Sequence, residues 1–194
     1  MSRVSGMTLL AALALPVLAL PAMVQAAPVA YTIESGHTYP SFETPHMGIS
    51  WWRGKFNHTT GKVMLDREAR SGSVEIVVDI GSVDFGHDGM NQRALSDQFF
   101  NAMKWPSATY QGTLRFSGDT PSSVEGTLTM MGVTRPLTLT INSFKCITNP
   151  MRGKEVCGAD AEGSFDRSSF GMTRDTDNGG GAVKLRIQVE AGRD

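Results

Sequence analysis

The segment Ala182–Ala191, AVKLRIQVEA, alternates apolar and polar side chains along its whole length. Successive side chains of a strand point to opposite faces, so this pattern predicts a β-strand with one dry face and one wet face. The same period of two recurs in SVEIVVDI (residues 73–80) and in PLTLTI (residues 136–141). Three half-buried strands of this kind predict an all-β protein.

Shorter strand-like runs fill much of the remaining chain: VAYTI (29–33), SWWRGKF (50–56), GKVMLD (61–66), ATYQGTLRF (108–116), VEGTLTM (124–130) and AEGSFDRSSF (161–170). Turn residues separate them, and about eight to ten antiparallel strands at such spacing indicate a sandwich or a closed barrel. Glycines inside the runs, as in YQGTL and VEGTL, favour a barrel because glycine is typical of bulges and sharp bends in a barrel wall.

The first 26 residues have the layout of a secretory signal peptide. Arg3 precedes the apolar run MTLLAALALPVLALPA, and the small residues Val24 and Ala26 predict cleavage near Ala26. The alternative is a membrane anchor, which the length alone would permit. Prolines in the run and the Val-x-Ala ending favour cleavage, so we expect an exported protein whose residues 27–194 form one domain.

The net charge and the two cysteines limit which partners and which kinds of site the sequence predicts. A formal net charge of -1 gives no electrostatic reason to expect nucleic acid as a partner. Cys146 and Cys157 flank ITNPMRGKEV, whose Asn-Pro and Gly predict a hairpin turn, and in an exported protein we expect a disulfide across it. Free thiols are the alternative. We predict no metal site, because the histidines are scattered and a structural zinc needs four ligands.

The segment Asp88–Pro106, DGMNQRALSDQFFNAMKWP, is the one helical pattern of the exported part. Leu95, Phe99, Ala102 and Met103 fall on one side of a helix spanning about residues 88–105. A second interpretation is two brief helices, with Ser96 capping the second. A short amphipathic helix of this kind would cover the open end of a barrel.

Large flexible apolar residues are abundant in the exported part, among them Met64, Met90, Met103, Met130, Met131, Met172, Trp51, Trp52, Phe85, Phe99, Phe100 and Phe116. Such residues suit an adaptable apolar cavity, and they suit the packed core of a filled barrel equally well. Composition alone leaves both interpretations open.

Motifs of catalysis are absent from the sequence: there is no Gly-x-Ser-x-Gly elbow, Walker loop, dinucleotide fingerprint or His-Glu-x-x-His helix. The densest polar cluster is FGHDGMNQR, with His87, Asp88, Asn91 and Arg93. It is either a solvated helix N-terminus with an Asp cap or a polar rim at a cavity mouth. Arg135 or Arg174 could serve at such a mouth equally well.

Several runs together resemble the YceI-like family of bacterial periplasmic lipid-binding proteins. They are YTIESGHTYPSFE, HMGISWWRGKFNHTTGKVMLD, SVDFGHDGMNQRALSDQFFNAMKWPSATYQGT, GTLTMMGVTRPLTLTI and FDRSSFGM. The most specific markers are Leu95, Phe100, Trp105, Pro106 and Tyr110, Gly-Val-Thr-x-Pro at 132–136, and Arg167, Phe170 and Gly171. The resemblance implies a lipocalin-like antiparallel β-barrel with an apolar tunnel that binds polyisoprenoid chains, and it implies no catalytic residues.

On this basis we expect a periplasmic carrier of an isoprenoid quinone, a polyprenyl phosphate or a similar long-chain lipid, with no cofactor besides that ligand. Its partners would be the lipid and, transiently, a membrane or a lipid-handling protein. The expected ligand-binding residues are Trp52, Phe85, Met90, Asn91, Arg93, Leu95, Phe99, Met103, Tyr110, Phe116, Met130, Phe144 and Phe170. Two alternatives are a small exported enzyme that uses His87, Asp88 and Arg93, and a stress-related interaction module whose barrel is filled by its own side chains.

Overall fold

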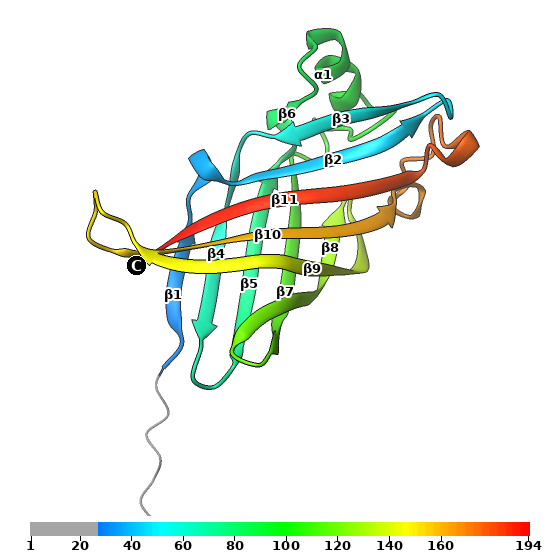
Figure 1. Cartoon of the computed structure of the whole chain (residues 1–194). Coiled ribbons are helices and arrows are strands. Elements are labelled where there is room, and N and C mark those ends of the chain that lie inside the picture. The colour runs from blue at the N-terminus through cyan, green and yellow to red at the C-terminus, as the bar shows by residue number, and fades with distance from the viewer. Residues whose placement is uncertain (1–26) are drawn as a thin grey trace, which may run out of the picture.

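A computed structural model describes residues 27–194 (Figure 1). The predicted signal peptide lies outside the described residues. The fold is mostly β, as predicted, and α1 (Asp88–Leu95) is the single α-helix of the described part. The strands are β1 (Val29–Ile33), β2 (Tyr39–His46), β3 (Ser50–Phe56), β4 (Thr59–Asp66), β5 (Ser71–Asp79), β6 (Val83–Asp84), β7 (Ser107–Ser117), β8 (Thr120–Met130), β9 (Val133–Thr148), β10 (Glu155–Asp166) and β11 (Ala182–Arg193). Short 3₁₀ turns are η1 (Ser35–His37), η2 (Ile80–Ser82), η3 (Arg167–Phe170) and η4 (Asp177–Gly179).

Eight strands close into an antiparallel barrel in the order β1-β4-β5-β7-β8-β9-β10-β11. Pairing of β1 with the C-terminal end of β11, from Tyr31 opposite Arg193 to Ile33 opposite Ala191, completes the wall. The earlier half of β11 pairs with β2 instead, and β3 and β6 follow at that edge. The predicted barrel is confirmed, but β2 and β6 were not among the predicted strands.

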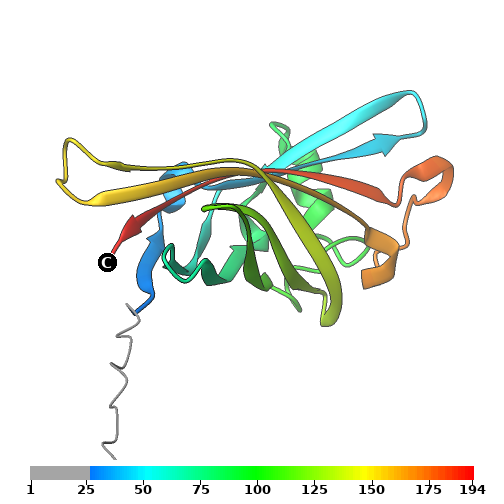
Figure 2. The same ribbon diagram turned by 60° about the horizontal axis from the view of Figure 1, so that its bottom comes forward.

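The barrel has two different ends (Figures 1 and 2). The closed end contains the turns β4–β5, β7–β8 and β9–β10, together with the start of β1 and the end of β11. The helix end contains α1, residues 96–106, the β2–β3 turn and the loop 171–181. Each end has its own apolar cluster, around Tyr31 and Leu65 at the closed end and around Phe56 and Ile80 at the helix end.

A β-bulge in the wall changes which side chains of β9 face inward. Asp160 of β10 pairs with Ser143 and Ala161 pairs with Ile141, so Asn142 is an extra residue. An extra residue reverses the alternation, because the side-chain period is two. This brings Phe144 into the barrel after Leu137, Leu139 and Ile141, which were predicted to share one face.

The predicted helix over residues 88–105 is shorter than expected, because α1 ends at Leu95. Ser96 is extended, with ψ of 167°, and its hydroxyl donates to the Arg93 carbonyl oxygen at 2.7 Å. Asn101 then takes a positive φ of 50°, which a continuing helix does not allow. Residues 97–104 form successive turns, so the predicted single apolar side of Leu95, Phe99 and Met103 does not exist.

The predicted disulfide is confirmed between Cys146 of β9 and Cys157 of β10. The two residues lie directly opposite each other in the strand pairing, with Cα atoms 4.0 Å apart. The bridge therefore ties two neighbouring strands of the wall near the closed end. Among the described residues no helix has the length and apolar character needed to cross a membrane.

Candidate functional site

The interior of the barrel holds a cavity of about 530 Å³. Its walls are the apolar faces that the alternating strands predict. The lining includes Val183, Leu185, Ile187 and Val189 of β11, Val74, Ile76 and Val78 of β5, and Leu137, Leu139 and Ile141 of β9. The volume lies within the range of about 300 to 1,000 Å³ that is usual for small-molecule sites. The barrel is thus hollow and apolar rather than filled.

Small residues of β10 make part of this space. Gly158, Ala159 and Ala161 all line the cavity, where the neighbouring strands contribute Phe144, Leu185 and Ile187. A wall of small side chains beside large ones leaves room that a fully packed barrel would not have.

Polar contacts link Tyr31, which lines the cavity, to Glu155 and Arg67 at the closed end, and we call this group the floor. The Tyr31 hydroxyl donates to Glu155 Oε1 at 2.5 Å, and Arg67 Nη2 donates to Glu155 Oε2 at 2.9 Å. Burial, reinforced by Glu155, raises the pKa of Tyr31, while the hydrogen bond from Tyr31 and then Arg67 lower the pKa of Glu155. Cys157 lines the cavity beside this floor, so the disulfide is part of the wall.

The ring of Tyr110, on β7, lines the cavity and occupies space that a side chain at Gly126 would fill. Its hydroxyl lies 2.9 Å from the Leu137 carbonyl oxygen and 3.2 Å from that of Val124. A Cβ added at Gly126 would stand 2.7 Å from Tyr110 Cζ, closer than such atoms approach. Burial raises the pKa of Tyr110 to about 12, so its proton stays available for these carbonyls. The interior glycine of VEGTL therefore makes room for an aromatic ring.

The cavity mouth at the helix end carries charge. Arg93 of α1 donates to Asp175 Oδ2 at 3.2 Å, which links the helix to the loop 171–181. Its guanidinium also lies 5.2 Å from the centre of the Phe99 ring. Arg93, Asp175 and Phe99 all line the cavity, and His46, stacked on Trp52 at 4.7 Å, faces it from the β2–β3 hairpin.

Arg167 builds the loop that carries Asp175. Its buried guanidinium donates to four backbone carbonyl oxygens of the loop, those of Met172, Arg174, Asp175 and Gly180, at 2.7 to 3.2 Å. Burial lowers the pKa of Arg167, and the nearby carboxylates of Asp175 and Asp166 oppose this shift. The Arg-x-x-Phe-Gly motif is thus a scaffold for one side of the mouth.

Eight of the thirteen predicted ligand-binding residues line the cavity: Trp52, Phe85, Met90, Arg93, Phe99, Tyr110, Met130 and Phe144. They come from β3, β7, β8, β9, α1 and the segments on either side of the helix, and the fold brings them together around one space. Their contact with a lipid stays a prediction.

The other five predicted residues lie outside the cavity lining. Asn91 instead accepts from the Phe85 backbone N–H at 2.8 Å and so holds the start of the helix. Met103 is 98% exposed because the helix stops before it. Leu95 and Phe170 pack in the apolar cluster of the helix end, and Phe116 packs with the core of the closed end beside an irregular pairing of β7 and β8.

Several lining residues were missed from the sequence, among them Phe42, Phe56, Phe100, Phe165, Arg167 and Asp175. One signal was available, because Pro40, Phe42, Thr44 and His46 of β2 all line the cavity at a strict period of two. Arg167 was singled out only as part of the Arg-x-x-Phe-Gly motif, and Asp175 had no signal, since both lie outside regular strands.

The polar cluster His87, Asp88 and Arg93 does not form one site. His87 is the N-cap of α1 and its Nδ1 accepts from the Met90 backbone N–H at 3.3 Å, a role that the sequence assigned to an Asp. His87 and Asp88 are exposed and outside the cavity lining, whereas Arg93 lines it. Of the other two candidates for the mouth, Arg135 donates to the Ser169 carbonyl oxygen and Arg174 pairs with Asp175.

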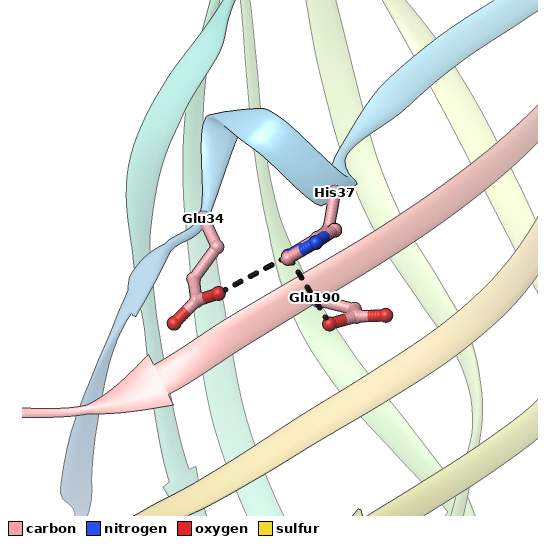
Figure 3. A group of neighbouring side chains, drawn as sticks. All are labelled: Glu34, His37 and Glu190. Carbon is pink, nitrogen blue, oxygen red and sulfur yellow. Dashed lines mark hydrogen bonds and ion pairs between the residues drawn. The ribbon is translucent and has the colours of Figure 1, made fainter. Parts of the chain in front are cut away.

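A second polar cluster lies on the outer wall, where Glu34, His37 and Glu190 meet (Figure 3). His37 Nδ1 is 3.3 Å from Glu34 Oε2 and 3.6 Å from Glu190 Oε2. The other oxygen of Glu34 accepts from Arg152 Nη1 at 2.5 Å, so the disulfide hairpin supplies a cation to the same cluster. These contacts tie η1, β11 and the β9–β10 loop together outside the barrel.

Comparison with known proteins agrees with this architecture. Residues 31–191 match the family model of the YceI-like domain. Protein YceI of Salmonella arizonae is 32% identical over 159 residues, which cover 81% of this chain and 82% of that protein. The crystal structure of Burkholderia cenocepacia BcnA aligns with a TM-score of 0.65 at 20% identity, over 81% of this chain and 98% of that one. A polyisoprenoid-binding domain from Saccharophagus degradans aligns with a TM-score of 0.63 at 13% identity, over 86% and 99% of the two chains. The chain, a closed antiparallel barrel around an apolar cavity, therefore belongs to the YceI-like family.

Proposed function

We propose that the protein is an exported carrier that holds one polyisoprenoid or similar long-chain lipid in the barrel cavity. The observation that carries this proposal is the continuous apolar lining of a 530 Å³ space inside a closed wall. Each methylene group moved from water into such a space contributes about 0.8 kcal/mol. A few isoprene units would therefore bind tightly without any charged contact.

The mouth supports a lipid whose one end is polar. Arg93 and Asp175 pair with each other across the entrance and both face the cavity. A quinone or phosphate headgroup placed there could accept a hydrogen bond from Arg93 in place of Asp175. The apolar chain would then extend along β11 and β5 toward Tyr31. An isoprenoid quinone and a polyprenyl phosphate both satisfy this arrangement.

The comparisons add support from a structural neighbour, since the Saccharophagus degradans domain is described as polyisoprenoid-binding. That property belongs to the neighbour, and the shared fold makes it a reasonable hypothesis for this cavity. The same comparisons favour a binding protein over the enzyme that would use His87, Asp88 and Arg93. The open cavity also argues against the interaction module with a filled barrel.

We place the carrier in the periplasm. The N-terminal segment of the sequence has the composition of a signal peptide, and the disulfide fits an oxidising compartment. Determination of the N-terminus of the protein isolated from a periplasmic extract tests this placement. We expect a start near Ala27, and retention of Met1 in the cytoplasmic fraction would contradict it.

The proposed function is tested by filling the cavity. Ala159→Phe places a ring in the space between Phe144 and Val189, so uptake of a short-chain ubiquinone, measured by native mass spectrometry, should fall about tenfold or more. Thr140→Phe adds the same ring on the outer face of β9 and should leave uptake unchanged. Equal uptake by both variants, at equal near-ultraviolet circular dichroism, would contradict the proposal.

A further inference from the structure

The tip of the β2–β3 hairpin is an exposed apolar point beside the cavity mouth. Met47 is 71% exposed, Ile49 81% and Trp51 40%, although all three are large apolar residues. Figures 1 and 2 both show this hairpin projecting beside the loop 171–181. Beyond Glu43 the pairing with β11 stops and the hairpin continues as two strands. Three exposed apolar side chains at the tip of one protruding hairpin indicate a contact surface.

The backbone of the turn is internally hydrogen-bonded. Met47 and Gly48 have φ values of 54° and 73°, and the Ile49 N–H donates to the His46 carbonyl oxygen at 3.1 Å. Both residues therefore have left-handed backbone in the connection between the paired residues His46 and Ser50. The tip therefore presents its apolar side chains without leaving that N–H to be satisfied by water.

The charge pattern of the hairpin favours a lipid surface as its occupant. The segment Thr44–Trp52 contains no Asp, Glu, Lys or Arg. At its base Arg53 Nε donates to Glu43 Oε2 at 3.2 Å, so the flanking charges compensate each other. An uncharged tip can enter the interfacial layer of a bilayer at low cost, because no charge has to be desolvated.

Trp51 and Lys184 form the pair of side chains expected at such an interface. The ammonium group of Lys184 lies 4.5 Å from the centre of the Trp51 ring. Tryptophan is enriched at the level of lipid headgroups, and a lysine stem can lie on apolar surface while its charge stays in water. The next residue, Trp52, points the other way and lines the cavity. One strand thus joins the exposed tip to the mouth.

We propose that the Met47–Trp51 tip docks into the interfacial layer of a lipid bilayer and holds the cavity mouth at that surface. The choice of a bilayer as occupant rests on the proposed function, since a lipid cargo enters and leaves through a membrane. Binding comes from apolar insertion rather than from charge. It should therefore depend little on anionic lipid and should persist in about 0.5 M salt, where surface electrostatics is screened.

The test is sedimentation with vesicles of phosphatidylethanolamine and phosphatidylglycerol, with phosphatidylcholine vesicles for comparison. Residues 27–194 are used, since they form the whole barrel and the apolar segment before them would bind vesicles by itself. The variant Met47→Ser/Ile49→Ser should reduce the partition coefficient about tenfold. The matched control Ile147→Ser/Met151→Ser alters two side chains of the disulfide hairpin that are 51% and 93% exposed, and should bind like the unaltered protein.

Equal binding by the two variants, or no vesicle binding by the unaltered protein, overturns the docking proposal. Binding only to vesicles that contain a membrane protein would also overturn it in favour of a protein receptor. Extraction of bound lipid from the same preparations is read separately. We expect the tip variant to lose vesicle binding and to keep its bound lipid. If the unaltered protein docks through the tip but contains no lipid, the carrier function is contradicted and the docking proposal stands.

Discussion

The closed end and the helix end of the barrel are stabilised in different ways. At the closed end, short turns join neighbouring strands, β1 completes the wall against β11, and the Cys146–Cys157 disulfide spans two strands. At the helix end, one short helix, successive turns and the loop 171–181 surround an opening, and Arg167 holds that loop through backbone carbonyl groups. The floor is thus a continuation of regular pairing, while the mouth consists of irregular segments held by side chains. Segments held in this way can rearrange without breaking the strand pairing of the wall.

The substitution Arg167→Met, at the helix end, should have the largest effect on the free energy of unfolding. It removes a buried guanidinium that four loop carbonyl groups share, so we expect a loss of about 3 kcal/mol in the free energy of unfolding, measured in urea. Arg135→Met removes an exposed arginine with one backbone contact and should cost about 0.5 kcal/mol or less. Similar losses in both variants would show that the mouth does not depend on Arg167.

Removal of the disulfide by Cys146→Ser/Cys157→Ser addresses the closed end. The bridge spans a sequence separation of 11 residues, and its loss should cost about 2 to 3 kcal/mol of unfolding free energy. Hydrogen exchange should accelerate in β9 and β10 near the closed end while α1 stays unchanged. Faster exchange in the loop 171–181 instead would mean that the two ends are not independent.

Tyr31→Phe should have a smaller effect, about 1 kcal/mol at neutral pH, through loss of its hydrogen bond to Glu155. The pKa of Glu155 is lowered in the folded protein, so its contribution is present above the ordinary carboxyl pKa and is lost as pH falls through the folded value. The pKa of Tyr31 is raised, so its contribution is full below pH of about 10 and is lost as pH rises through the folded value. The variant should therefore lose less stability between pH 5 and 3 than the unaltered protein, in urea titrations at each pH. An unchanged slope would contradict this account of the floor.

The smallest change in stability is expected from Arg93→Gln and Asp175→Asn, because the pair is exposed and such pairs contribute about 0 to 1 kcal/mol. Because the pair lies across the cavity mouth, breaking it should speed the release of a bound short-chain ubiquinone to empty vesicles in both variants. Arg115→Gln breaks an equally exposed pair with Glu125 on the outer wall and should leave the release rate unchanged. Identical release from all three variants would show that the Arg93–Asp175 pair does not slow the exit of ligand.

The strand pattern predicted the barrel wall better than the mouth, for a physical reason. Alternation in β5, β9 and β11 reports one face of a regular strand, and those faces line the cavity as expected. Phe144 faces inward through a bulge that depends on how β9 pairs with β10, so its placement needs the tertiary structure. The helix prediction failed beyond Leu95 because Ser96 and Asn101 break the backbone locally, which turned Met103 to solvent. Asp175 and Arg167 are far from α1 in sequence, and only the folded loop, which Arg167 holds, brings Asp175 to Arg93.

The central claim is that the cavity carries a long-chain isoprenoid lipid, and the most direct measurement is the content of the protein itself. The protein is purified without detergent from the compartment to which it is exported, extracted with organic solvent, and the extract is analysed by mass spectrometry beside that of Ala159→Phe. We predict a stoichiometric quinone or polyprenyl lipid from the unaltered protein and depletion from the variant. An extract free of long-chain lipid, from protein that also fails to take up a short-chain ubiquinone, would contradict the account.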